Sequence, residues 1–200
     1  RFEPEVQCEW PAAFDIDAPD NVNVRVPPLV VDLGGDEVPE IVFVTSPYPD
    51  SSASPWPSRI RAIRGDDCSP VWTSMQSHDF NSSLAIGDVD GDGEVEVCGR
   101  GNTYDGNCVP FCLNGEDGSL QWEGTDSAGS KLSLSCPGNG RLFDPGVAIA
   151  DVDTDGSVEV VVGLNVLDGK TGALEHASVR STPNMGPPGW ESFLAALADV

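Results

Sequence analysis

Short apolar runs separated by polar, glycine-rich segments recur along the whole chain. The clearest runs are residues 41–44 (IVFV), 84–87 (LAIG), 95–98 (VEVC), 147–150 (VAIA) and 158–162 (VEVVV). Their length and their β-branched side chains predict strands, because Val and Ile pack well on a pleated surface. The nearest approach to an amphipathic helix, residues 191–197, is short. The pattern therefore predicts an all-β chain.

An acidic loop of nine residues joins two pairs of these strands. Carboxylates occupy its first, third, fifth and ninth positions, as Asp88, Asp90, Asp92 and Glu96 in one copy and as Asp151, Asp153, Asp155 and Glu159 in the other. Carboxylate oxygens suit a hard cation, and carboxylates this close would repel one another without one. A surface turn rich in Asp and Gly is the alternative for a single copy. Two matching copies favour two calcium loops, with the backbone carbonyls of Glu94 and Ser157 as further ligands.

The loop differs from an EF-hand, because Gly99 and Val162 stand at its twelfth positions and strands flank it. A weaker copy contains Asp32, Asp36 and Glu40, with the carbonyl of Val38 in the seventh position. This copy has Gly34 at the third position, so its calcium site is the doubtful one.

The acidic loops belong to a tandem repeat whose fourth copy begins at residues 198–200 (ADV). The first aspartates of the copies, Asp32, Asp88, Asp151 and Asp199, are about 50 to 60 residues apart, which is typical of four-stranded propeller blades. A hairpin turn also recurs, at residues 63–68, 113–118 and 167–172. Each unit is therefore predicted to be strand, acidic loop, strand, strand, hairpin turn, strand.

These units predict an all-β fold, a partial β-propeller of four-stranded antiparallel blades with calcium loops between the first and second strands. Residues 1–200 are expected to be a fragment of one propeller domain, whose free edge the remaining blades of the same chain would cover. The predicted divisions are a preceding blade end or N-terminal strand (1–21), repeat 1 (22–80), repeat 2 (81–145), repeat 3 (146–194) and the start of repeat 4 (195–200).

The D-x-D-x-D-G-x-x-E loop followed by an aliphatic strand resembles FG-GAP or VCBS-type repeats, the blades of integrin-α-like β-propellers, in a version common in bacterial surface and secreted proteins. The resemblance covers residues 22–200. It implies an extracellular, calcium-stabilised module used for adhesion or for display of ligand-binding loops. The tripeptide Arg64-Gly65-Asp66, which some integrins recognise, falls in a hairpin turn, where the glycine is expected to serve the turn.

The net charge of the chain limits the classes of partner that it can bind. A formal net charge of −23 argues against nucleic-acid binding, since phosphates would be repelled, and disfavours attraction to membrane surfaces. No run approaches the roughly 18 apolar residues of a membrane helix. The expected partner is therefore a protein or glycan ligand.

Six cysteines indicate an oxidising, extracytoplasmic compartment. Zinc is the competing interpretation, but the chain has no Cys-x-x-Cys pair, and both histidines stand away from the cysteines. Aligning the second and third units places Cys98 and Cys112 at positions that a tight hairpin would bring opposite one another. We therefore predict a Cys98–Cys112 disulfide, which leaves Cys108 with Cys136 and Cys8 with Cys68.

Three functions fit these features. The first is a calcium-binding extracellular propeller for adhesion or ligand binding, in which calcium is structural. The second is a propeller-type polysaccharide lyase or hydrolase whose catalytic residues lie largely outside this segment, and the third is a structural spacer in a large surface protein. The sequence has no nucleophile motif and no metal-binding histidine pair, and His78-Asp79 is the one candidate acid/base pair. We therefore expect no enzymatic activity and assign no catalytic residue.

Overall fold

The chain is all-β throughout the part that the structure describes. The computed structural model describes residues 3, 5–6, 9–10, 19–47, 58–79, 82–102, 107–135, 146–163 and 165–177. These residues contain β-strands and no helix, which confirms the predicted fold class. None of these residues belongs to a helix able to cross a membrane. The short helix considered at residues 191–197 and the predicted fourth repeat start lie outside the described residues.

The strands form three antiparallel sheets, which we call blades 1, 2 and 3. In each blade, four strands consecutive in sequence are also neighbours in the sheet. Blade 1 contains β2 (Leu29–Val31), β3 (Glu40–Pro47), β4 (Arg59–Arg64) and β5 (Pro70–Ser74); blade 2 contains β6 (Ala85–Gly87), β7 (Glu96–Asn102), β8 (Asn107–Asn114) and β9 (Leu120–Glu123); blade 3 contains β11 (Val147–Ala150), β12 (Glu159–Val162), β13 (Asn165–Asp168) and β14 (Leu174–Ala177).

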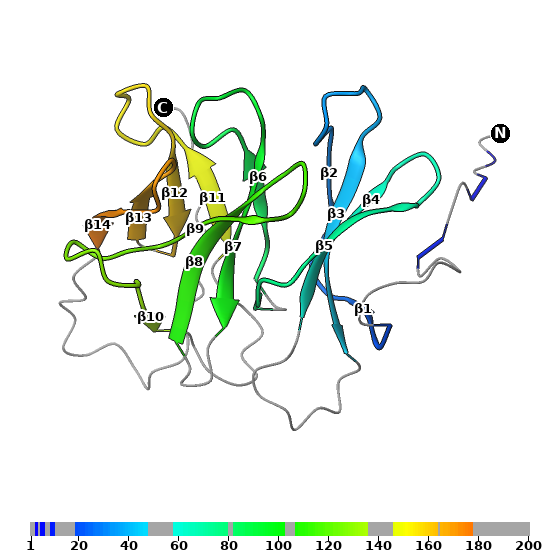
Figure 1. The fold of residues 1–200 in the computed structure, drawn as a ribbon, viewed down its shortest axis with the longest axis horizontal. Helices are drawn as coiled ribbons and strands as arrows, with labels where there is room; N and C mark the ends of the chain where they lie inside the picture. Colours follow the sequence, from blue (N-terminus) through cyan, green and yellow to red (C-terminus); the bar gives the residue numbers. More distant parts are fainter. Residues whose placement is uncertain are drawn as a thin grey trace.

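Two short strands extend the first two blades. β1 (Asn21–Val24) pairs with the far end of β3, and β10 (Leu134–Ser135) pairs with the beginning of β8. The three blades stand side by side in chain order (Figure 1). This arrangement is a partial β-propeller, because a meander of four strands repeats as a lateral stack. The predicted repeat limits stay predictions.

Apolar side chains that alternate along the strands fill the spaces between blades. Blade 2 shows this alternation most clearly, because adjacent residues of β7 and β8 face opposite neighbours. Val97, Phe111 and Leu113 pack with residues of blade 1, whereas Cys98 and Cys112 pack with residues of blade 3. The two interfaces are therefore the main cores, and each blade depends on its neighbours for burial.

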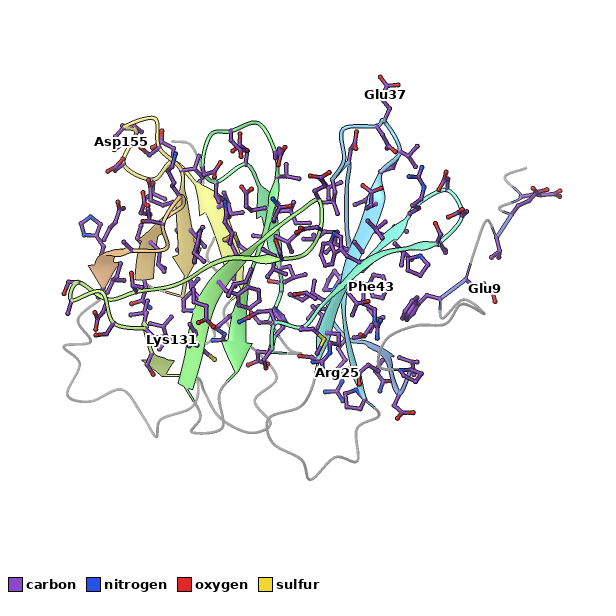
Figure 2. The ribbon with its side chains drawn as sticks, in the orientation of Figure 1. Glu9, Arg25, Glu37, Phe43, Lys131 and Asp155 are labelled. Atoms are coloured by element: carbon purple, nitrogen blue, oxygen red, sulfur yellow. A yellow bond between two sulfur atoms is a disulfide. The ribbon has the colours of Figure 1, made fainter. Side chains whose placement is uncertain are left out.

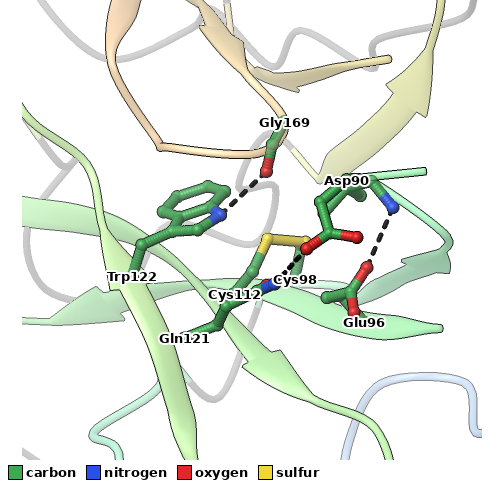
Figure 3. The surroundings of a disulfide bond; sticks show 8 residues. Asp90, Glu96, Cys98, Cys112, Gln121, Trp122 and Gly169 are labelled. Atoms are coloured by element: carbon green, nitrogen blue, oxygen red, sulfur yellow. Dashed lines mark hydrogen bonds between the residues drawn. A yellow bond between two sulfur atoms is a disulfide. The ribbon is translucent and has the colours of Figure 1, made fainter. Parts of the chain in front are cut away.

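A tryptophan on the fourth strand of a blade bonds to the next blade. The Trp72 indole N–H donates to the Gly115 carbonyl at 2.8 Å, and the Trp122 indole N–H donates to the Gly169 carbonyl at 2.8 Å (Figure 3). Both acceptors lie in the hairpin turn that joins the third and fourth strands of the next blade. We call this contact the tryptophan latch.

Trp10 covers the other face of blade 1. Its ring packs edge-on against Phe43, with centroids 5.0 Å apart, and the Arg61 guanidinium lies 5.3 Å from the centroid of the Trp10 ring. Ile63, Cys68 and Ile41 belong to the same smaller apolar cluster. The Trp10 indole nitrogen is buried without a hydrogen-bond partner, unlike those of Trp72 and Trp122.

The predicted disulfide between Cys98 and Cys112 is confirmed. The two residues face each other across β7 and β8, with Cα atoms 4.0 Å apart, and both are fully buried on the side of blade 2 that packs against blade 3 (Figure 3). Cys68 and Cys108 are also disulfide-bonded. Their predicted partners, Cys8 and Cys136, lie outside the described residues, so these two pairings stay predictions.

Candidate metal centres

Three acidic loops leave the same end of the three sheets. Loop 1 (residues 32–40), loop 2 (88–96) and loop 3 (151–159) each join the first two strands of a blade. They form the upper edge in Figure 1, and Glu37 and Asp155 mark the tips of loops 1 and 3 in Figure 2.

All three loops share one backbone conformation. The fourth and sixth positions have positive φ in every loop, at Gly35 (66°) and Glu37 (66°), Gly91 (79°) and Gly93 (92°), and Thr154 (63°) and Gly156 (93°). Glycine is favoured at such positions because it has no Cβ to clash with the carbonyl oxygen. Glu37 and Thr154 keep the conformation without glycine, so the hydrogen bonds of the loop must hold it.

Carboxylates organise these hydrogen bonds. The first-position aspartate accepts from the sixth-position N–H in every loop, through Oδ2 of Asp32, Asp88 and Asp151 at 3.0 Å. The fifth-position aspartate accepts from the seventh-position N–H, as in Glu94 N–H to Asp92 Oδ1 at 2.8 Å and Ser157 N–H to Asp155 Oδ1 at 2.7 Å. The aspartates therefore stabilise the conformation of the loop through hydrogen bonds, in addition to giving it negative charge.

The ninth-position glutamate is buried at the base of each loop. Glu40, Glu96 and Glu159 are only 4%, 1% and 2% exposed. One oxygen of each accepts from the second-position N–H, at 2.8 Å from Leu33, 2.9 Å from Val89 and 2.7 Å from Val152. Each carboxylate has a second oxygen available for a further bond.

Two of the loops bring three carboxylates together. Single oxygens of Asp88, Asp90 and Glu96 lie within 4.8 Å of one another, and the same holds for Asp151, Asp153 and Glu159. Either cluster could hold a metal ion. Among the described residues, loop 1 forms no such group, because Gly34 replaces the third-position carboxylate.

The remaining predicted ligands have other geometry. Asp92 and Asp155 stand outside the two groups and accept the backbone hydrogen bonds given above. Ligand roles for these aspartates and for the carbonyls of Glu94 and Ser157 stay predictions, as do those for Asp32, Asp36, Val38 and Glu40 in loop 1.

The ionised form of two buried glutamates is disfavoured. Burial is the main cause that raises the pKa of Glu96 to about 6, and the nearby charges of Asp90, Asp92 and Asp88 add to it against the hydrogen bond from Val89. Burial likewise raises the pKa of Glu159, helped by Asp153, Glu175 and Asp151. A cation between the carboxylates would remove this penalty, since opposite charge favours the ionised form.

The hairpin turn of each blade is docked on the end of its acidic loop. Gly65, Gly115 and Gly169 donate N–H bonds to the carbonyls of Pro39 (2.9 Å), Val95 (3.0 Å) and Val158 (2.9 Å). A Cβ on any of these glycines would collide with the same carbonyl. These glycines therefore serve the turn through this close approach, whereas positive φ occurs three residues later, at Cys68, Gly118 and Gly172.

Two polar side chains contact the acidic loops in a way that the sequence did not predict. Arg64 Nη1 bonds Asp36 Oδ2 at 3.2 Å, and its Nε bonds Asp66 Oδ1 at 3.1 Å, so the Arg and Asp of the Arg64-Gly65-Asp66 tripeptide are paired with each other. Gln121 Nε2 donates to Asp90 Oδ2 at 3.1 Å (Figure 3). The only sequence signal for these contacts is position: Arg64 directly precedes the hairpin glycine, and Gln121 directly precedes the latch tryptophan.

The candidate acid/base pair is buried. His78 is 1% exposed between blades 1 and 2, and burial lowers its pKa to about 3, which leaves the imidazole neutral. Asp79 is ion-paired with Arg100 at 3.2 Å. Arg100 is near the end of β7, whereas acidic loop 2 lies where β7 begins.

Comparisons with known proteins support the fold. No family model and no curated protein matches the chain. Among solved structures, the chain is similar to the V. cholerae biofilm matrix protein Bap1, with 23% identity and a TM-score of 0.53 over 82% of this chain and 26% of Bap1. The rhamnogalacturonan lyases YesX (14% identity, TM-score 0.40, 72% of this chain and 39% of that one) and YesW (17%, 0.39, 75% and 41%) are more distant. The chain thus spans about a quarter of Bap1, with which it shares the fold.

Proposed function

We propose that the chain is a calcium-binding β-propeller module of the FG-GAP or VCBS type, in which calcium stabilises structure. The observation that carries this proposal is the pair of matched three-carboxylate groups on two loops of the same conformation. Hard oxygen donors of this kind suit calcium, whose coordination tolerates irregular geometry better than that of magnesium. Asp88, Asp90 and Glu96 would hold one ion, and Asp151, Asp153 and Glu159 the other.

The proposed role of calcium is to join loop to strand. Each group combines two loop aspartates with the glutamate that begins the next strand, Glu96 in β7 or Glu159 in β12. In loop 2 the glutamate also bonds Val89, which is 2% exposed in the core shared with blade 3. An ion would therefore stabilise the interface between blades as well as its own loop.

We propose an extracellular location and a protein or glycan ligand. The disulfides support an oxidising compartment. Bap1, which shares the fold, is a biofilm matrix protein, and this supports a matrix or surface role. The charge of −23 favours such ligands over nucleic acid.

We also propose that this segment is not itself an enzyme. The burial of His78 supports this, because an imidazole closed off from solvent cannot exchange protons with a polysaccharide. The aspartates of the loops are committed to backbone hydrogen bonds and to the proposed ions.

Calcium titration with and without the key aspartates tests the proposal. In excess calcium, each site should add about 2.7 kcal/mol at one hundred times its Kd, which is roughly 5–10 °C in melting temperature for a chain of this length. Asp90→Asn and Asp153→Asn each keep an oxygen for the loop hydrogen bond, so each should abolish one site while the loop still folds. Asp20→Asn, outside the loops, is the charge-matched control. Equal melting temperatures in calcium and in chelator would refute the proposal.

A further inference from the structure

Loop 1 has the conformation of a cation loop without the complete set of ligands. Its positive φ angles and its bonds from Glu37 N–H to Asp32 and from Leu33 N–H to Glu40 match those of loops 2 and 3. Gly34, however, offers no carboxylate at the third position. Loop 1 therefore lacks the three-carboxylate group that loops 2 and 3 contain.

A guanidinium lies against this loop. Arg64 begins the hairpin turn of blade 1 and stands directly across the sheet from Glu40. Its Nη1 contacts Asp36 Oδ2 at 3.2 Å, while Asp36 Oδ1 accepts from Val38 N–H at 2.9 Å. Both oxygens of the fifth-position carboxylate are thus already bonded.

The same position in the other blades carries no cation. Asn114 stands across from Glu96, and Asp168 stands across from Glu159. Asn114 Oδ1 accepts from Glu116 N–H, and Asp168 Oδ1 accepts from Thr171 N–H, both at 2.8 Å, so both side chains cap their own turns. Blade 1 therefore differs from the others in two linked ways, a missing carboxylate and an added positive charge.

We propose that the Arg64 guanidinium takes the place of the cation in loop 1, so that blade 1 folds without metal while blades 2 and 3 depend on it. This inference rests on the proposed calcium sites in loops 2 and 3. A guanidinium held against the loop by Asp36 would repel a divalent ion bound to the same loop. The third-position residue of the loop and the residue before the hairpin glycine thus decide together whether a blade takes an ion.

Conversion of loop 1 into a calcium site tests the inference. Gly34→Asp supplies the missing carboxylate, and it is sterically free, because no atom lies within 4 Å of the added Cβ and the φ angle is not positive. Arg64→Asn copies Asn114 of blade 2. Calcium stoichiometry, measured by equilibrium dialysis on the full chain, should rise from two ions in the natural protein to three in the Gly34→Asp/Arg64→Asn double variant.

The matched control is Gly34→Asp/Arg59→Asn, which has the same composition of charge but keeps Arg64, and it should bind two ions. Near-UV circular dichroism checks folding, and Gly34→Asp/Arg64→Gln replaces the double variant if that one does not fold. Three ions in the natural protein, or two in the folded double variant, would overturn the inference. Failure of the calcium proposal itself has a different signature, which is no ion bound to the natural protein.

Discussion

Replacing a latch tryptophan with phenylalanine should show how much the indole hydrogen bond contributes to the free energy of unfolding, apart from the packing of the ring. In Trp122→Phe, the buried carbonyl of Gly169 loses the donor that lies 2.8 Å away. A buried acceptor left without a partner costs about 1–3 kcal/mol, and the smaller ring costs roughly 1 kcal/mol more. The free energy of unfolding should therefore fall by about 2–4 kcal/mol, which is roughly 4–16 °C in melting temperature. Trp72→Phe, which breaks the equivalent bond to Gly115, should behave alike.

Trp10 provides the control within the same molecule. Its ring is packed against Phe43, but its indole nitrogen is buried without a hydrogen-bond partner. Trp10→Phe therefore removes ring area and relieves an unpaired donor, so its cost should stay within about 1 kcal/mol. Urea and thermal unfolding followed by far-UV circular dichroism in saturating calcium would compare the three variants. Equal losses for Trp122→Phe and Trp10→Phe would show that the hydrogen bond of the latch contributes nothing.

Two further perturbations address the glutamate base and the disulfide. Because the pKa of Glu96 is raised to about 6 in the folded protein, the stability from its protonation is fully present below about pH 4.5 and is lost as the pH rises through 6. In chelator, Glu96→Gln should therefore gain stability relative to the natural protein between pH 4.5 and 7. Parallel pH profiles of the two proteins in urea unfolding would contradict this. Cys98→Val with Cys112→Ala copies the Val42 and Ala62 pair of blade 1 and should cost about 3 kcal/mol for the 14-residue separation. An unchanged melting temperature under nonreducing conditions would show that the bond does not stabilise the fold.

The strand order and the loop positions followed from the sequence because both repeat. Alternating Val and Ile residues around the acidic nonapeptides predicted β6, β7, β11 and β12 to within a few residues, although β7 continues to Asn102. The Cys98–Cys112 pair was predictable for the same reason, since the unbroken hairpin of blade 3 gives the register that blade 2 follows.

Side-chain direction was harder to predict. Asp90 and Asp92 each accept a backbone hydrogen bond within the loop, and nothing in the spacing shows that Asp90 alone joins the three-carboxylate group. Arg64 looked like part of a recognition tripeptide, because its partner Asp36 lies 28 residues away in sequence and meets it only through the sheet. Long-range contacts of this kind depend on the register between strands, which local patterns do not contain.

The tryptophan latch gives the stack a direction. Trp72 reaches forward from blade 1 to blade 2, and Trp122 reaches forward from blade 2 to blade 3. Blade 2 therefore accepts an indole hydrogen bond from blade 1 and donates one to blade 3. Loss or duplication of a blade such as blade 2 would again place an indole donor against a hairpin carbonyl.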